Sequence, residues 1–271
     1  MPVDRRELAK HISVSTVLII VVHGEEILSK GSGIIFADDG SVMTAGHVIH
    51  KGKPYTQQEL ADPTLKFYVK VKGHPPREYI QATPIIRIKN DFFGNEVIID
   101  LVGLMPRAPW HLKLPFMFLT TTPPEIGDAV FMAGYSEETE FPFSFDRRLR
   151  TSLKGFSEFN SAMKSGYEVE LGSLMIKSGI VGNLSGYSFG SESGGVTVKG
   201  FMFYVDNGMH RGASGGPIVT EDGKVAGIIT ERAMIRLSTN KIPEFHVPSG
   251  STLGLTVEPL LALPGTKIES R

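Results

Sequence analysis

A serine framed by glycines is the residue of this sequence best suited to covalent chemistry. Ser214 lies in the segment Gly-Ala-Ser-Gly-Gly-Pro that begins at Gly212. A serine hydroxyl is a weak nucleophile unless a base takes its proton, and the tetrahedral intermediate that follows needs N–H donors for its oxyanion. Glycines let the backbone adopt the tight turn that presents such donors. The segment therefore predicts a nucleophile, Ser214, with an oxyanion hole formed by the N–H groups of Gly212 and Ser214.

A base and an orienting acid for this serine are found earlier in the chain. His47 follows the apolar strand-like run that begins at Ser41, in the small-residue sequence Thr-Ala-Gly-His. Asp100 lies inside the apolar run at residues 97–102, where a carboxylate is costly to bury unless it accepts hydrogen bonds. Holding a histidine ring in the correct tautomer is one role that satisfies such a carboxylate. Taken alone, Asp100 is better explained by a turn or an edge position.

The pattern Gly-x-Ser-x-Gly also occurs in α/β-hydrolases, where a helix follows the serine and the histidine comes last. Here Pro217 is followed by Ile218 and Val219, which predict a strand. Only 57 of the 271 residues follow Ser214, too few to complete a hydrolase fold. The hydrolase alternative is therefore rejected.

The order histidine, aspartate, serine resembles that of the trypsin-like, chymotrypsin-fold serine peptidases, and most closely the bacterial Deg (high-temperature-requirement) type. The resemblance runs through separate motifs between about Val17 and Val257, which are Gly-Ser-Gly at 31–33, Gly-Asp-Ala-Val at 127–130, Gly-Ile-Val at 179–181 and Val-Ala-Gly-Ile-Ile at 225–229. It implies that Ser214 attacks a peptide carbonyl, that His47 acts as general base and then acid, and that Asp100 orients His47. It implies no metal and no cofactor, with a polypeptide as substrate.

Two departures from the family are informative. Ala213 stands where digestive proteases carry an aspartate that captures a newly cleaved N-terminus, so that activation switch is not expected here. The chain ends at Arg271, and we expect no PDZ module.

Substrate-binding residues follow from the same resemblance. Gly208, six residues before the serine, stands where a carboxylate would select basic residues, so we expect small or medium apolar residues at the cleaved position unless Asp206 reaches the pocket. Met209 is expected to line that pocket. The further substrate contacts are predicted on an edge of backbone that pairs with an extended peptide, at Thr230, Glu231 and Arg232.

Many short β-branched runs, separated by turns such as Asp39-Gly40 and Asp222-Gly223, predict an all-β protein. With the resemblance, the fold class is two six-stranded antiparallel β-barrels with short terminal helices at about 4–10 and 258–263. We divide the chain into an N-terminal barrel at 1–119, carrying His47 and Asp100, and a C-terminal barrel at 120–271, carrying Ser214. Residues 136–165 and 236–251 are expected to be loops, the first of them a surface insertion or a lid.

Composition narrows the functional classes. A net charge of −1 provides no basic excess for binding nucleic acid, and no stretch approaches the length of a membrane span. The chain has no cysteine, so disulfides and thiolate metal sites are excluded and a reducing compartment is tolerated. We expect a cytoplasmic, prokaryotic protein; were the apolar stretch at 12–22 a signal peptide, the protein would be periplasmic or secreted. The sequence leaves the oligomeric state open.

A second functional reading stays open beside the active peptidase. The same fold could be a pseudo-protease that binds extended peptides, or a dormant enzyme that a partner or ligand activates. The complete set of His47, Asp100 and Ser214 argues against a pure binder, since binding alone needs none of their chemistry.

Overall fold

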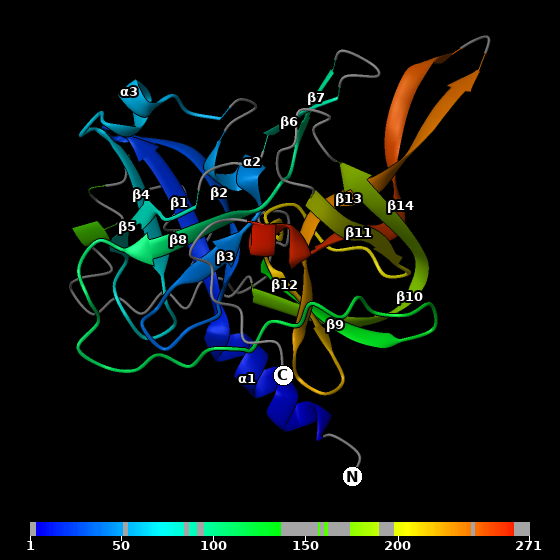
Figure 1. The fold of residues 1–271 in the computed structure, drawn as a ribbon, viewed down its shortest axis with the longest axis horizontal. Coiled ribbons are helices and arrows are strands. Elements are labelled where there is room, and N and C mark those ends of the chain that lie inside the picture. Colours follow the sequence, from blue (N-terminus) through cyan, green and yellow to red (C-terminus); the bar gives the residue numbers. More distant parts are fainter. Residues whose placement is uncertain are drawn as a thin grey trace.

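Two closed barrels of six antiparallel strands each make up most of the protein (Figure 1). The structure is a computed structural model that describes residues 4–50, 54–83, 87–90, 95–136, 157, 160–161, 174–189, 198–239 and 242–262. The predicted all-β class with two six-stranded barrels is confirmed. The strands of the first barrel fall between residues 16 and 106 and those of the second between 129 and 256, so the predicted division at 119/120 lies in the connecting segment.

The first barrel is ordered β1-β2-β3-β8-β5-β4. Its strands are β1 (Thr16–His23), β2 (Glu26–Ile35), β3 (Val42–Thr44), β4 (Leu65–Lys70), β5 (Arg77–Gln81) and β8 (Val102–Pro106). β1 is a β-branched run that is buried over seven of its eight residues, as a strand enclosed on both faces should be. It turns into β2 at Gly24, which adopts a positive φ of 60°.

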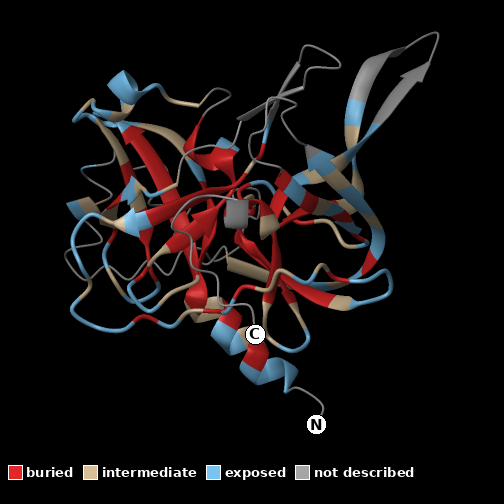
Figure 2. Cartoon of the chain, in the orientation of Figure 1, coloured by how far each residue is buried: buried red, intermediate tan, exposed pale blue. Residues whose placement is uncertain are grey.

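The second barrel is ordered β10-β11-β14-β13-β12-β9. Its strands are β9 (Ala129–Tyr135), β10 (Leu174–Phe189), β11 (Val198–Val205), β12 (Pro217–Thr220), β13 (Val225–Thr239) and β14 (Ile242–Thr256). Phe203 is fully buried at its centre. Gly227 and Gly254 make room for that ring, because a Cβ on either would lie within 2.9 Å of it. Buried residues, red in Figure 2, lie along the strands of both barrels.

Helices are short and lie outside the barrels: α1 (Arg5–Ser15), α2 (Gly46–Ile49), α3 (Gln57–Leu60) and the 3₁₀-helix η1 (Glu258–Ala262). α1 begins where the Asp4 carboxylate accepts a hydrogen bond from the Arg6 N–H at 2.9 Å. It extends five residues beyond the predicted helix and takes up the first part of the apolar stretch at 12–22, while β1 takes up the rest. Within the described residues, no helix has the length and apolarity to cross a bilayer.

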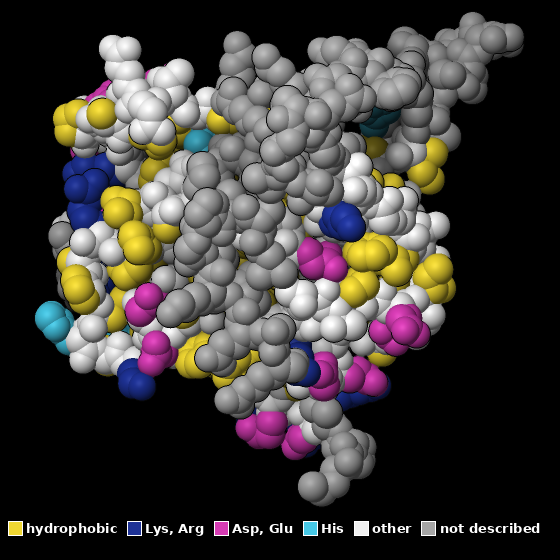
Figure 3. All heavy atoms as spheres, in the orientation of Figure 1, with side chains coloured by type: hydrophobic (Ala, Val, Ile, Leu, Met, Phe, Trp, Pro, Cys, Tyr) yellow, Lys and Arg dark blue, Asp and Glu magenta, His cyan; other side chains and the backbone are white. Residues whose placement is uncertain are grey.

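Acidic and basic side chains are interspersed on the face drawn in Figure 3. Two ion pairs involve α1, Arg5 with Glu221 at 2.8 Å and Lys10 with Glu7 at 2.6 Å. Exposed pairs of this kind contribute little stability. Because the acidic and basic side chains alternate, the visible part of this face has no large patch of charge of one sign.

Two hairpins extend upward from the barrels in Figure 1. One is formed by β6 (Arg87–Asn90) and β7 (Asn95–Ile98), and the other by the outer parts of β13 and β14. The predicted loop at 236–251 was therefore wrong: β13 and β14 continue their antiparallel pairing across it, from Met234–Pro248 to Thr239–Ile242. β6 is separate from β5, which ends at Gln81. Most of the predicted loop at 136–165 lies outside the described residues.

Candidate active site

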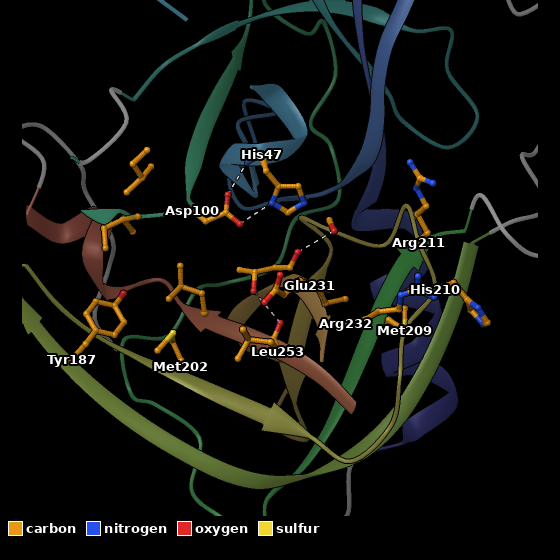
Figure 4. A pocket seen from close by; sticks show the side chains of 16 residues that line it. His47, Asp100, Tyr187, Met202, Met209, His210, Arg211, Glu231, Arg232 and Leu253 are labelled. Carbon is orange, nitrogen blue, oxygen red and sulfur yellow. Dashed lines mark hydrogen bonds and ion pairs between the residues drawn. The ribbon is translucent and has the colours of Figure 1, made fainter. Parts of the chain in front are cut away.

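A cavity of about 620 Å³ brings the three predicted triad residues together. His47 and Asp100 come from the first barrel (Figure 4) and Ser214 from the second. All three line this cavity. They are far apart in the chain, so the barrels have to pack against each other to form the site. The apposition of β2 and β9, which contact each other, contributes to that packing.

His47 lies in α2, the single helical turn that follows β3. The two Asp100 oxygens hold it at two points: Oδ1 accepts the His47 backbone N–H at 2.8 Å, and Oδ2 lies 2.8 Å from Nδ1 of the ring. Gly46 makes this approach possible, since a Cβ there would lie 3.1 Å from Oδ1 of Asp100. The ring is thereby fixed with Nδ1 toward the carboxylate and Nε2 away from it.

Asp100 does not lie within a strand, as the apolar run at 97–104 had suggested. β7 ends at Ile98 and β8 begins at Val102, so Asp100 is in the connection between them. Its neighbours Ile99 and Leu101 are buried, and a hydrogen bond of 2.9 Å joins the Leu101 N–H to the Ile99 carbonyl. This tight turn anchors its apolar flanks in the core and directs the carboxylate between them toward His47.

The electrostatics of the pair favour a protonated His47. Burial of the ring lowers its pKa, but the hydrogen bond that the ring donates to Asp100 and the negative charges of Asp100 and Glu231 outweigh that effect. The net result is a His47 pKa above its ordinary value of 6.5. A base of this strength is suited to taking a proton from a serine near neutral pH.

The Ser214 loop joins β11 to β12, and its peptide groups are anchored one after another. The Ala213 N–H donates to the His210 carbonyl at 3.2 Å, and the Ala213 carbonyl accepts from the Gly216 N–H at 2.9 Å. The Gly215 N–H donates to the Ile229 carbonyl at 2.7 Å. Gly215 has a φ of 84°, and a Cβ there would collide with Thr44 and Ser32 of the first barrel, so the loop requires glycine at this position.

Two N–H groups of this loop stand apart from the others. Within the described residues, neither the Gly212 N–H nor the Ser214 N–H donates a hydrogen bond to the chain. Gly212 adopts a φ of 90°, which its lack of a side chain permits. These are the two donors predicted for the oxyanion hole, and both are free of competing acceptors in that part of the chain.

The Ser214 hydroxyl itself is directed to the second barrel. Its Oγ donates to the Thr230 carbonyl at 3.0 Å. Ser214 and His47 are both described in the structure, and no hydrogen bond connects their side chains. Thr230 lies at a β-bulge, since the register of β13 against β14 shifts between Ile229 and Glu231. A bulge turns backbone groups out of the ladder, and here it leaves the Thr230 carbonyl to accept from Ser214.

The predicted substrate-binding residues divide into two groups. Met209, Thr230, Glu231 and Arg232 line the cavity together with the triad. Gly208 is not among the described lining residues, and its carbonyl accepts from the Lys177 ammonium group at 2.6 Å. Asp206 does not reach the cavity either, because its carboxylate accepts the Ile180 N–H at 2.7 Å. Arg232 and Arg211 bring positive charge to the rim in place of an aspartate.

Sequence reasoning did not identify the apolar wall of the cavity. It is formed by Tyr187 of β10, Met202 of β11 and Leu253 of β14, on three neighbouring strands of the second barrel (Figure 4). Met202 is 40% exposed, although its residue type is typical of a core. Apolar residues in strands carry no local signal that separates a core position from a cavity wall, so only the barrel closure reveals them.

A second cleft of about 460 Å³ adjoins the first, since His47, Arg211 and Ser214 line both. Its other walls include Leu28 and Lys30 of β2. The reacting residues thus lie between two recesses, as a site that holds a chain on both sides of a bond requires. Among the described residues, no three His, Asp or Glu side chains converge in a group that could hold a metal ion.

Comparison with known proteins agrees with this fold. The trypsin-like peptidase domain profile matches residues 31–228. A crystal structure of the protease Rv3671c in an inactive form superposes with a TM-score of 0.52 at 16% sequence identity, over 96% of this chain and 94% of that one. An inactive serine-to-alanine mutant of Rv3671c from M. tuberculosis H37Rv gives 0.50 at 16% identity, over 95% and 88%. Among curated protein sequences none matches this chain. At such identities the structural likeness concerns the fold.

Proposed function

Because this chain belongs to the trypsin-like peptidase family, we propose that it is a serine endopeptidase with Ser214 as nucleophile, His47 as general base and acid, and Asp100 as the group that orients His47. The observation that carries the proposal is the pairing of His47 with Asp100 at 2.8 Å in the same cavity that Ser214 lines. The finer resemblance to the Deg type rests on the sequence motifs alone.

The reaction proceeds through an acyl-enzyme. Ser214 Oγ attacks the peptide carbonyl carbon while Nε2 of His47 takes the hydroxyl proton, and the carbonyl π electrons move onto oxygen. The Gly212 and Ser214 N–H groups stabilise this oxyanion. As the oxyanion collapses, the C–N bond breaks and His47 returns the proton to the leaving amine. Water then attacks the ester by the same route, which releases the acid product and restores Ser214.

An extended peptide is the substrate form that this site accommodates. β12 pairs with β13 only as far as Ile228. The backbone of the next part of β13, at Thr230, Glu231 and Arg232, therefore lies beyond the end of β12 on that side. A peptide added along this edge would place a carbonyl at Ser214 and side chains against the apolar wall that includes Tyr187. We therefore propose apolar side chains on the acyl side of the cleaved bond.

A dormant form of the same enzyme is the second candidate. It is favoured by the Ser214 hydroxyl, which donates to Thr230 and not to His47. Both Rv3671c structures are described as inactive forms. On this reading substrate or a partner has to displace the Thr230 contact before Ser214 engages His47.

Labelling with a fluorophosphonate probe tests the proposal. We expect wild-type protein to be labelled and Ser214→Ala to remain unlabelled, with Ser13→Ala on α1 as the control for loss of an ordinary hydroxyl. Labelling that survives in Ser214→Ala would refute Ser214 as nucleophile. Folded wild-type protein that the probe labels only when an activating partner is added would favour the dormant candidate.

A further inference from the structure

Ser32 connects the two barrels at the Ser214 loop. It lies in β2 of the first barrel, between the two glycines of the Gly-Ser-Gly motif, and its side chain is fully buried. A serine hydroxyl in a closed interior has to find partners for its polar atoms, because an unpaired buried hydroxyl is costly. The partners that Ser32 finds all belong to the machinery around Ser214 or to the strands that support it.

The hydroxyl of Ser32 spans from one part of the second barrel to another. Its Oγ donates to the Gly212 carbonyl at 2.9 Å and accepts the Tyr135 N–H of β9 at 2.8 Å. A hydroxyl has one proton to donate, and that proton goes to Gly212. The orientation of this proton is fixed by the backbone donor from Tyr135, which occupies an acceptor position of the same oxygen.

The backbone of Ser32 holds the same loop two residues further on. Its N–H donates to the Ser214 carbonyl at 2.8 Å, and its own carbonyl accepts the Thr44 hydroxyl at 2.7 Å. Thr44 ends β3 and precedes the turn that carries His47. Ser32 thereby links β3, the strand that precedes His47, to the carbonyls of Gly212 and Ser214.

Gly212 is the position where such a link has most effect. Its N–H is one of the two proposed oxyanion donors, and a glycine at a φ of 90° has no side chain to stop its backbone from rotating. Among the described residues, the Ser32 hydroxyl is the hydrogen-bond donor to its carbonyl. The Ala213 N–H, at the other end of the same peptide group, donates to the His210 carbonyl at 3.2 Å, and the Ala213 side chain is a methyl group that adds no polar contact.

We infer that Ser32 is a positioning residue for the oxyanion hole: its hydroxyl holds the Gly212 carbonyl and so keeps the Gly212 N–H aimed at the reacting carbonyl. The kinetic part of this inference rests on the proposed peptidase function, whereas the link itself rests on the geometry alone. Since the link runs between the barrels, any change in how the barrels pack is transmitted to the oxyanion hole.

The test compares Ser32→Ala with Thr16→Val. Thr16 is a matched control, because it is fully buried in the neighbouring strand β1 and its hydroxyl donates to the Ile12 carbonyl at 2.8 Å, away from the site. We expect Ser32→Ala to lower kcat about tenfold to a hundredfold per titratable active site, with KM nearly unchanged. Thr16→Val should keep the wild-type kcat, although both variants lose thermal stability.

Hydrogen exchange gives a readout that needs no activity. The Tyr135 amide loses its acceptor in Ser32→Ala, so we expect faster exchange there and across 212–216 than in wild type or Thr16→Val. Exchange that changes equally in both variants, or a wild-type kcat in Ser32→Ala, would overturn the inference. Absence of probe labelling in wild type together with the selective exchange change would refute the proposed function but leave the link standing.

Discussion

In the first barrel His47 already has the partner that orients it, whereas in the second barrel the Ser214 hydroxyl has no hydrogen bond to His47. His47 is held by Asp100 through both the ring and the backbone, each at 2.8 Å. The backbone around Ser214 is equally well anchored, but the hydroxyl donates to Thr230 at 3.0 Å. The two halves therefore differ in a side-chain contact and not in how their backbones are anchored.

This difference indicates which half of the site can change its arrangement with the smaller loss of free energy. Breaking the His47–Asp100 pair would require moving the buried turn at Ile99–Leu101, which the core opposes. Turning the Ser214 side chain to another staggered rotamer moves one oxygen and exchanges one hydrogen bond for another, on the fast timescale of side-chain motion. In the proposed mechanism the base is therefore preorganised, and the nucleophile is the group that substrate would reorient.

Removing the nucleophile should have the largest effect on activity and a small one on the fold. We expect Ser214→Ala to lower peptide hydrolysis about a millionfold, the loss observed when a catalytic serine is removed from a comparable triad. Its melting temperature should stay close to that of wild type, since only the hydrogen bond to Thr230 is lost. Activity of purified Ser214→Ala above background in a fluorogenic peptide assay would place the nucleophile elsewhere.

Asp100→Asn tests the contact that holds His47 in the first barrel. An amide in this place can donate to Nδ1 of His47, which stabilises the wrong tautomer, so we expect kcat to fall about 10⁴-fold. The amide oxygen can still accept the His47 backbone N–H, and the position of α2 should be kept. Steady-state kinetics with a short peptide substrate measure the loss; a decrease of less than tenfold would mean that another group orients His47.

The three residues that meet in the cavity could be located from sequence because each of them carries a local signal. Ser214 is framed by glycines that only a tight, donor-rich turn requires, and Asp100 is a charge in an apolar run. Neither signal reveals side-chain direction, so the contact of Ser214 with Thr230 could not be foreseen. It arises from a β-bulge, which depends on how β13 pairs with β14.

The least predictable parts depend on strand pairing over long distances. Residues 236–251 look like a loop because proline, serine and glycine recur in them, yet β13 and β14 support each other as a long hairpin. Ser32 has the same limitation: as part of Gly-Ser-Gly it marks a family motif, but three of its four hydrogen-bond partners, Tyr135, Gly212 and Ser214, are far away in the chain.

The pH dependence of activity sharpens the comparison by reporting on His47 alone. The catalytic form of His47 is neutral, so activity should increase with pH as the ring loses its proton. Since Asp100 and Glu231 raise the His47 pKa above 6.5, the midpoint of this increase should lie above that of an ordinary histidine. A profile of kcat/KM from pH 5 to 9 measures it, and a flat profile would exclude a histidine base.

Glu231→Gln should have the smallest effect. Glu231 is exposed on β13 and acts on His47 only through its charge, so the substitution removes one of the contributions that raise the His47 pKa. The acidic limb of the pH profile should shift to lower pH in dilute buffer, and the shift should shrink as salt screens the charge. Glu221→Gln removes an equal charge beside α1 and should leave the limb in place. An equal shift in both variants would mean that the His47 pKa responds to the net charge of the protein and not to the position of Glu231. The second barrel would then contribute Ser214 without affecting the His47 pKa.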